Sequence, residues 1–203
     1  MNPALVTGLV LAGGQGRRMG GLDKGLQRYG DTTLARHALQ RLAPQVGRTM
    51  LSANRHLADY AALGVPVWPD ALPGLPDYSG PLAGFLAGLD HCKTPWLATV
   101  PCDTPHFPVD LVARLADALE AAGAELAVAA TRDGDSLRLQ PTFCLMHAGV
   151  KDSLRQYLQS GERRISTWTA QRHRVEVVFD EPDAFANANT LDDLDRLRPP
   201  RRP

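Results

Sequence analysis

Short apolar runs alternate with stretches of helical period along the first 130 residues of the chain. The apolar runs lie at residues 5–11, 49–53, 65–68, 96–100 and 126–130, and their length is typical of buried strands. Between them, apolar residues recur three or four positions apart, as in helices with one buried face. This alternation predicts an α/β fold in which a parallel sheet lies between layers of helices.

Five stretches of helical period are predicted to form helices. Pro81 suits the first turn of one of them, and Gly123 and Gly161 are placed to end two others. A segment rich in Pro and Gly over residues 71–80 predicts a loop. The predicted helices lie at residues 34–46, 57–63, 81–89, 111–119 and 150–158.

The strand–helix alternation breaks after residue 130. Asp133 and Gly134 predict a turn, and residues 141–147 predict a strand that returns quickly and therefore runs antiparallel. Further on, residues 175–179 predict a late strand, and Thr190 with Asp193 resembles a capping box that opens a last short helix. We expect one domain over residues 1–198, a three-layer sandwich with a mostly parallel central sheet and an antiparallel strand in its C-terminal half. Residues 199–203 are expected to be a disordered tail.

The composition argues against several classes of protein, among them nucleic-acid binders, membrane proteins and secreted proteins. The 203 residues hold 22 basic and 22 acidic side chains, and this zero net charge argues against a nucleic-acid or anionic-membrane partner. No apolar run approaches the length of a membrane helix, and the N-terminus lacks the pattern of a signal peptide. The three cysteines have neither metal-ligand spacing nor an even number. We expect a cytoplasmic protein without a disulfide framework.

A glycine-rich segment follows the first predicted strand. Residues 9–25, LVLAGGQGRRMGGLDKG, hold six glycines, two arginines and one lysine. Glycines after a strand let backbone N–H groups surround a phosphate. The segment is not a P-loop, because Lys24 is followed by Gly25, and it is not a dinucleotide fingerprint, because Met19 replaces the third glycine. A flexible turn with solvated arginines is the alternative, but the density of glycines and cations favours a triphosphate.

Two aspartates follow other predicted strands. Asp103 comes after residues 96–100, and Asp70 comes after residues 65–68. Open α/β sheets bind ligands where their parallel strands end, and Mg²⁺ prefers one or two carboxylates together with substrate phosphates and water. The alternative is that Asp103 caps a helix. With the glycine-rich segment, these aspartates indicate nucleotide chemistry that uses Mg²⁺.

The chain resembles the molybdenum cofactor guanylyltransferases over essentially its whole length except the tail. The motifs that carry the resemblance are VLAGGQGRRMGGLDKG, WPD, GPLAG, PCDTP, GERR and FANANTLDDL. The first motif alone marks the wider superfamily of nucleotidyltransferases with a Rossmann-like fold, and its combination with PCDTP and F-x-N-x-N-T is narrower. The resemblance implies transfer of GMP from GTP to the terminal phosphate of molybdopterin, with release of pyrophosphate. The implied product is the guanine dinucleotide form of the cofactor.

The resemblance also implies roles for individual residues. Asp103 would bind Mg²⁺ as well as the nucleotide, and Lys24 would bind phosphates. The family usually carries asparagine where Ser52 stands, and serine keeps a hydrogen-bonding oxygen but lacks the amide donors for reading guanine or ribose. Asn54 and Arg55 match the family pattern. The implied nucleotide-binding residues are Leu11, Ala12, Gly13, Gly14, Lys24, Ser52, Asp70 and Asp103.

The acceptor pocket is expected between the C-terminal edge of the sheet and the later half of the chain. Arg163 and Arg164 suit an acceptor that carries phosphate, although they equally suit a solvated helix end. Either asparagine of the FANANT segment could complete the metal shell or brace its loop. The candidate acceptor-binding residues are Pro141, Thr142, Arg163, Arg164, Asn187 and Asn189. Molybdenum-insertion proteins and molybdoenzyme chaperones are the protein partners that the resemblance implies.

The expected chemistry is in-line attack of the acceptor phosphate on the α-phosphorus of GTP. A phosphate is already ionised at neutral pH, so positioning and charge stabilisation suffice without a general base. The residues expected to stabilise the charge are Asp103, Lys24 and Arg18. A cytidylyltransferase of the same family is one alternative, although Gly14 favours guanine by the family pattern. A GTP-binding delivery protein without catalysis is another, but the chain retains Asp103 and Lys24.

Overall fold

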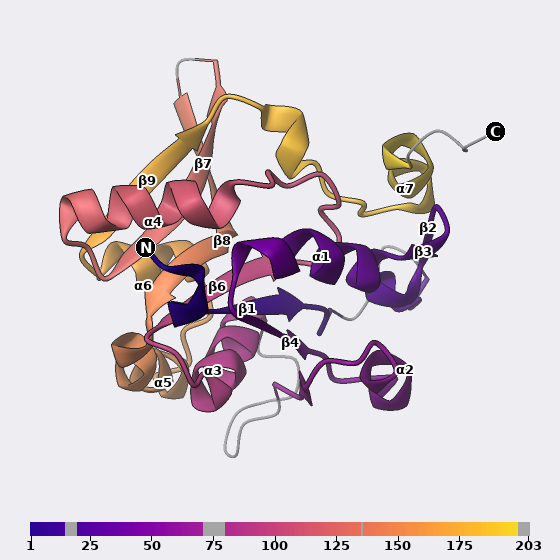
Figure 1. Ribbon diagram of the computed structural model, residues 1–203, viewed down its shortest axis with the longest axis horizontal. Coiled ribbons are helices and arrows are strands. Elements are labelled where there is room, and N and C mark those ends of the chain that lie inside the picture. The colour runs from indigo at the N-terminus through magenta and orange to yellow at the C-terminus, as the bar shows by residue number, and fades with distance from the viewer. Residues whose placement is uncertain (15–19, 71–79, 135, 199–203) are drawn as a thin grey trace.

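A seven-stranded sheet forms the centre of the computed structural model, which describes residues 1–14, 20–70, 80–134 and 136–198 (Figure 1). Its strand order is β5-β4-β1-β6-β8-β7-β9, and β8 alone runs antiparallel to its two neighbours. The strands are β1 (Val6–Leu11), β4 (Arg48–Ser52), β5 (Val67–Trp68), β6 (Trp96–Pro101), β7 (Leu126–Asp133), β8 (Ser136–His147) and β9 (Arg174–Phe179). A separate hairpin pairs β2 (Arg28–Tyr29) with β3 (Thr32–Thr33). The mostly parallel sheet with one reversed strand is confirmed.

Helices cover both faces of the sheet (Figure 1). Residues of α1 and α4 share one hydrophobic cluster with the sheet, and residues of α3, α5 and α6 share the other. The helices are α1 (Leu34–Leu42), α2 (Leu57–Ala61), α3 (Pro81–His91), α4 (Leu111–Ala122), α5 (Lys151–Gln159), α6 (Ile165–Ala170) and α7 (Leu191–Leu197). Short 3₁₀ turns are η1 (Pro3–Leu5), η3 (Lys24–Leu26), η4 (Ala43–Gln45), η5 (Ala148–Val150) and η6 (Pro182–Phe185). These layers confirm the predicted three-layer sandwich.

The central strand shows why the apolar runs are continuous. Val6 and Val10 of β1 lie in the cluster with α1 and α4, whereas Leu9 points to the opposite cluster. Successive side chains of a strand point to opposite faces, so a strand covered on both sides is apolar at nearly every position. β1 lies inside the sheet between β4 and β6, where its C-terminal end can present a ligand site.

Two glycines let α3 lie close to β1. A Cβ atom at Gly84 would stand 2.8 Å from Cδ2 of Leu11, and one at Gly88 would stand 2.5 Å from Cδ2 of Leu9. Any larger residue would push the helix outward from the sheet. This close packing places the start of α3 next to the C-terminal end of β1. Pro81 occupies the first position of the helix.

Several elements differ from the sequence prediction. The strand predicted over residues 141–147 begins earlier, at Ser136, because the turn at Gly134 (φ 60°) lets β8 pair with β7 on both sides of a register shift between Val128 and Ala129. The hairpin β2–β3 and helix α6 were not predicted, since two-residue strands and a six-residue helix show no clear period. The capping box of Thr190 and Asp193 at the start of α7 is confirmed.

The predictions of a loop over residues 71–80 and a tail over residues 199–203 lie outside the described residues, apart from Gly80. Among the helices that the structure does describe, none combines the length and the apolar character needed to cross a membrane.

Candidate active site

Four parallel strands end side by side at one edge of the sheet. In the strand register, Leu11 of β1 stands opposite both Ser52 of β4 and Pro101 of β6, and Ser52 stands opposite Trp68 of β5. The residues that follow these strands therefore gather at a common edge, where ligands bind in open α/β sheets. This edge brings together the glycine-rich segment and both predicted aspartates.

A lysine ammonium group joins two side chains from distant parts of the chain. Nζ of Lys24 lies 2.9 Å from Oδ2 of Asp103 and 2.9 Å from Oδ1 of Asn189. The side chains of Lys24 and Asp103 are only 19% and 20% exposed, so this ion pair is partly shielded from water. A carboxylate oxygen and an amide oxygen thus converge on one positive charge. The arrangement forms a cation-binding corner, and Asp103 does not serve as a helix cap.

The 3₁₀ turn η3, which begins at Lys24, is capped by the preceding residue. Oδ1 of Asp23 accepts from the backbone N–H of Gly25 at 3.2 Å. The hydroxyl of Tyr60 donates to the same oxygen, and burial raises the pKa of Tyr60 so that the hydroxyl stays protonated. Gly25 packs so closely on Tyr60 that a side chain at that position would overlap the hydroxyl.

The segment before α7 is fixed to the residues after β6. The N–H of Ala188 donates to the carbonyl oxygen of Asp103 at 2.7 Å, and the hydroxyl of Thr104 donates to Oδ1 of Asn187. Asn189 is thereby presented to Lys24. Of the two candidate asparagines, Asn189 lies at the cation-binding corner and Asn187 braces the loop.

A second polar group lies at the end of β5. The N–H of Asp70 donates to Oδ1 of Asn54 at 2.9 Å, and Nδ2 of Asn54 is buried and donates to no described residue. A Cβ atom at Gly13 would stand 3.0 Å from Oδ2 of Asp70 and 3.2 Å from Nδ2 of Asn54. A carboxylate acceptor and an amide donor therefore approach the backbone of the glycine-rich segment.

The environment of Asp70 disfavours its charge. Only 8% of the residue is exposed, and this burial raises the pKa of its carboxyl above the ordinary value, while the nearby Asn54 amide opposes part of the rise. A buried carboxylate gains most from a ligand that donates hydrogen bonds to it. This chemistry suits the N–H groups of a nucleotide base.

At the other predicted nucleotide-binding positions, the described contacts are mainly backbone hydrogen bonds. The N–H of Ala12 donates to the carbonyl oxygen of Ser52 at 2.8 Å, and the N–H of Cys102 donates to that of Leu11 at 3.0 Å. The Ser52 side chain is almost fully buried, and its hydroxyl has no partner among the described residues. Gly14 is exposed, and Arg18 lies outside the described residues.

Cys102 precedes Asp103 but is not available for chemistry. Its side chain is buried, and this burial raises the pKa of the thiol well above its ordinary value. The thiol stays protonated and packs in the cluster with α1 and α4. In the part of the chain that the structure describes, no three His, Cys, Asp or Glu side chains group as a metal site.

Apart from Asn187 and Asn189, the predicted acceptor-binding residues lie in two places. Pro141 and Thr142 belong to β8, where the carbonyl oxygen of Thr142 accepts from the Thr99 hydroxyl at 2.8 Å. Arg163 donates to the carbonyl oxygens of Leu158 and Glu162, both at 2.7 Å, at the end of α5. No hydrogen bond between described residues joins Arg163 or Arg164 to Asp103. Their role toward the acceptor stays a prediction.

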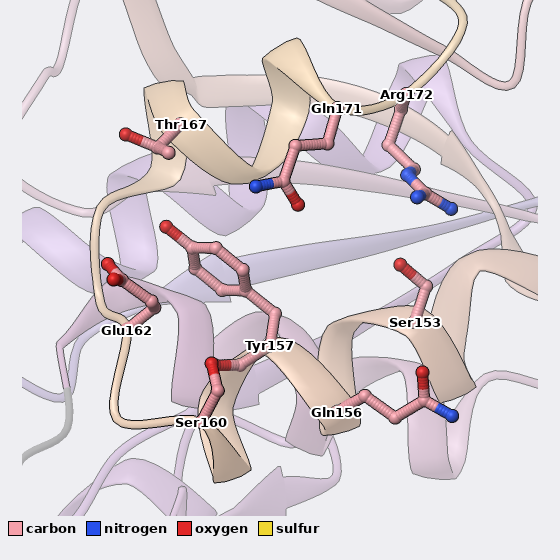
Figure 2. A pocket seen from close by; sticks show the side chains of 8 residues that line it. All are labelled: Ser153, Gln156, Tyr157, Ser160, Glu162, Thr167, Gln171 and Arg172. Atoms are coloured by element: carbon pink, nitrogen blue, oxygen red, sulfur yellow. The ribbon is translucent and has the colours of Figure 1, made fainter.

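A separate hollow lies between α5 and α6, and Figure 2 shows Tyr157 pointing across it. The Tyr157 hydroxyl donates to the carbonyl oxygen of Arg164 at 3.1 Å, so this hollow adjoins the connection between the two helices. It contains none of the strand-end residues described above. Its lining residues are Ser153, Gln156, Tyr157, Ser160, Glu162, Thr167, Gln171 and Arg172.

Two contributors to the strand-end site carry no role in the sequence prediction. Asn54 fixes the backbone of Asp70, and Arg55 donates to the carbonyl oxygens of Gly14 and Gly21. Both follow β4 directly, so their place after a predicted strand is the signal that could have found them. Tyr60 gave no such signal, because an aromatic residue within a helix is usually part of the core.

Known proteins are similar to this chain over nearly its full length. Residues 8–176 match the family model described as the MobA-like NTP transferase domain. The chain is 58% identical over 192 residues to the molybdenum cofactor guanylyltransferase of Bordetella petrii, covering 95% of this chain and 96% of that relative. It is 57% identical over 190 residues to the molybdenum cofactor guanylyltransferase of Cupriavidus taiwanensis, covering 93% and 94%.

Among solved structures, the fold is similar to molybdopterin-guanine dinucleotide biosynthesis protein A from Archaeoglobus fulgidus. The TM-score is 0.73 at 23% sequence identity, and the match covers 94% of this chain and 95% of that one. At this identity the likeness supports the fold, and the Rossmann-like architecture is confirmed.

Proposed function

The chain belongs to the molybdenum cofactor guanylyltransferase family and is a nucleotidyltransferase, and we propose that its reaction takes place where β1, β4, β5 and β6 end. The reaction is transfer of GMP from GTP to the molybdopterin of the cofactor, with release of pyrophosphate. The observation that carries the location is the cation-binding corner of Lys24, Asp103 and Asn189 beside the glycine-rich segment.

The base side of the nucleotide is assigned to the end of β5. Guanine offers N–H donors on its N1 and N2 nitrogens and an acceptor at O6. The Asp70 carboxylate can accept from the donors, and Nδ2 of Asn54, which donates to no described residue, can donate to the acceptor. Gly13 leaves both groups close to the backbone, and a larger residue there would press on them. This complementarity supports guanine as the base.

The phosphate side is assigned to the glycine-rich segment and Lys24. Backbone N–H groups of the segment and the Lys24 ammonium would hold the phosphates, and Arg18 is proposed to assist. The ion pair with Asp103 keeps the Lys24 ammonium at the strand-end edge before nucleotide arrives. Preorganised charge of this kind lowers the barrier as pyrophosphate leaves.

The donor set at the cation-binding corner fits Mg²⁺. Asp103 and Asn189 present oxygens to a single point, which the Lys24 ammonium occupies as a stand-in cation. Carboxylate and amide oxygens are hard ligands of the type that Mg²⁺ takes together with substrate phosphates. Asp103 would hold the ion with support from Asn189, and bound Mg²⁺ would supply neutralisation of phosphate charge.

The chain's residues act chiefly by orientation. The attacking phosphate of molybdopterin is ionised at neutral pH, so no side chain needs to remove a proton. The glycine-rich segment and Asp70 would fix the nucleotide with its α-phosphorus exposed to the acceptor. The acceptor is assigned to the side of the edge that carries Pro141, Thr142, Asn187 and Asn189, with Arg163 and Arg164 as further candidates.

We place this reaction in the cytoplasm and assign it to a single domain over residues 1–198. Molybdenum-insertion proteins and molybdoenzyme chaperones are proposed as the partners that deliver the acceptor and receive the product. Nucleic acid and membranes have no part in the proposal, in keeping with the zero net charge.

A double-label experiment tests which bond of the nucleotide is cleaved. GTP labelled at the α-phosphorus should transfer its label to molybdopterin, whereas label at the γ-phosphorus should appear in pyrophosphate. Appearance of γ-label in inorganic phosphate, with the α-label retained in GDP, would identify a GTPase and contradict the proposal.

A further inference from the structure

Arg55 bridges Gly14, three residues after the end of β1, and Gly21, three residues before Lys24. One terminal nitrogen of its guanidinium group donates to the carbonyl oxygen of Gly21 at 3.0 Å, and the other donates to that of Gly14 at 3.3 Å. The two carbonyl groups lie far from Arg55 in sequence, by 34 and 41 residues. A planar fork with two donors is suited to joining two acceptors at once, which a lysine cannot do in the same way.

The charge of Arg55 is not used in an ion pair with any residue that the structure describes. The side chain is half-buried, and its described partners are both neutral carbonyl oxygens. A guanidinium group kept beside a glycine-rich segment without a carboxylate partner adds positive potential where phosphates are proposed to bind. Arg55 therefore links the carbonyl groups of Gly14 and Gly21 and also adds positive charge beside them.

The backbone next to Arg55 is strained. His56 has φ 50° and ψ 38°, and it is the one residue other than glycine with positive φ in the described part of the chain. A left-handed conformation is unfavourable for a residue with a Cβ and is kept where the surroundings require it. It makes a sharp corner between β4 and α2, at the sheet edge that carries the proposed site (Figure 1).

Residues on either side of Arg55 hold other parts of the same site. Asn54 accepts from the N–H of Asp70, and Tyr60 of α2 donates to Asp23 beside Lys24. The corner between β4 and α2 thus contacts the proposed base side, the glycine-rich segment and the turn that carries Lys24.

We propose that Arg55 is a positioning residue that ties Gly14 to Gly21 and so holds these two glycines in place beside the proposed triphosphate site. This inference rests on the proposed function, because it assigns the segment to GTP. Loss of the bridge leaves the protein folded but lets Gly14 and Gly21 separate, so that these glycines must be brought together when nucleotide binds, which weakens binding.

The test compares three variants. Arg55→Met removes both donors and the charge, Arg55→Lys keeps the charge without the fork, and Arg48→Met is the matched control. Arg48 is an exposed arginine at the opposite end of the same strand, and it forms no hydrogen bond or ion pair with a described residue. Circular dichroism and thermal unfolding verify that each variant is folded. If Arg55→Met folds poorly, the same measurements are made with Arg55→Lys in its place.

Hydrogen exchange of the nucleotide-free protein gives a measure that does not depend on activity. Backbone amides of Gly14, Gly20 and Gly21 should exchange at least about tenfold faster in Arg55→Met than in the wild type or Arg48→Met. Binding of GTP without acceptor should weaken roughly tenfold in Arg55→Met, with Arg55→Lys in between. In turnover the KM for GTP should rise more than the KM for the acceptor.

Unchanged exchange in folded Arg55→Met would overturn the bridge, whatever the enzyme does with GTP. Faster exchange with unchanged GTP binding would overturn its role in nucleotide binding. If the wild type itself fails to transfer GMP, the proposed function falls, while the exchange result still decides whether Arg55 holds Gly14 and Gly21 in place.

Discussion

Lys24 and Asp103, which are 79 positions apart in the chain, form an ion pair across the proposed site with Nζ 2.9 Å from Oδ2. Asn189, which is 165 residues from Lys24, accepts from the same ammonium group at 2.9 Å. The lysine therefore joins the segments after β1, after β6 and before α7. It occupies a position where a metal ion would meet the same two oxygens, so lysine and metal should compete for Asp103.

Replacement of Lys24 tests this competition. Lys24→Met removes the ammonium group, so the nucleotide-free protein should bind Mn²⁺, used as a probe for Mg²⁺, more tightly than the wild type. Turnover should nevertheless fall, because loss of one preorganised cation costs about 2–4 kcal/mol of activation free energy. Electron paramagnetic resonance measures free Mn²⁺ in the first experiment. Lys93→Met, at an exposed lysine, is the control, and weaker Mn²⁺ binding by Lys24→Met would contradict the competition.

The ionised carboxylate of Asp70 should reduce the free energy of unfolding of the nucleotide-free protein at neutral pH. Burial raises the pKa of Asp70 in the folded chain above its ordinary value of 3.8, so the folded chain holds this proton more tightly than the unfolded chain. Stability is then lost as the pH rises from 3.8 through the folded pKa, and the full cost is present at neutral pH. Asp70→Asn should raise the unfolding temperature at pH 7 by roughly 2–4 °C.

The same substitution should weaken GTP binding, because the amide offers one acceptor oxygen and a donor where the carboxylate offers two acceptors. Thermal unfolding from pH 7 to pH 4 gives the stability, and calorimetry gives the affinity. The advantage in unfolding temperature should shrink as the pH falls. An advantage that stays constant over this range, or a loss of stability at pH 7, would show that Asp70 ionisation is not the cause.

Gly13→Ala should act through Asp70. The added Cβ would lie 3.0 Å from Oδ2 of Asp70 and 3.2 Å from Nδ2 of Asn54, so these side chains must move. We expect the Kd for GTP to rise roughly tenfold, as for the loss of a hydrogen bond to a charged group. When Asp70→Ala has already removed the carboxylate, Gly13→Ala should add little, since residues in contact are not additive. Full additivity of the two changes in binding free energy would refute this route.

Much of the fold could be predicted because each central element buries both faces or one clear stripe. Val6, Leu9 and Val10 make β1 apolar throughout, and the stripe from Leu34 to Leu42 marks α1. The short elements could not be predicted in this way. Helix α6 spans only Ile165–Ala170, too few residues for its period to be read, and β2 pairs over two residues.

The site was predicted where chemistry and strand ends coincide. Asp70 and Asp103 follow strands, so their residue type and position together indicate a ligand edge. The contacts between side chains were less accessible, because they depend on segments brought together by the fold. The link from Arg55 to Gly21 and the link from Asn189 to Lys24 leave no periodic trace in the sequence.

Pyrophosphate release across the four nucleoside triphosphates tests the central claim most directly. Each triphosphate is supplied with Mg²⁺, with and without molybdopterin, to the wild type, to Asp103→Asn and to Asp117→Asn, an exposed aspartate of α4. The account predicts release that requires GTP and molybdopterin, that persists in Asp117→Asn and that falls at least about 100-fold in Asp103→Asn. Equal release with CTP, release without molybdopterin, or an active Asp103→Asn variant would contradict it.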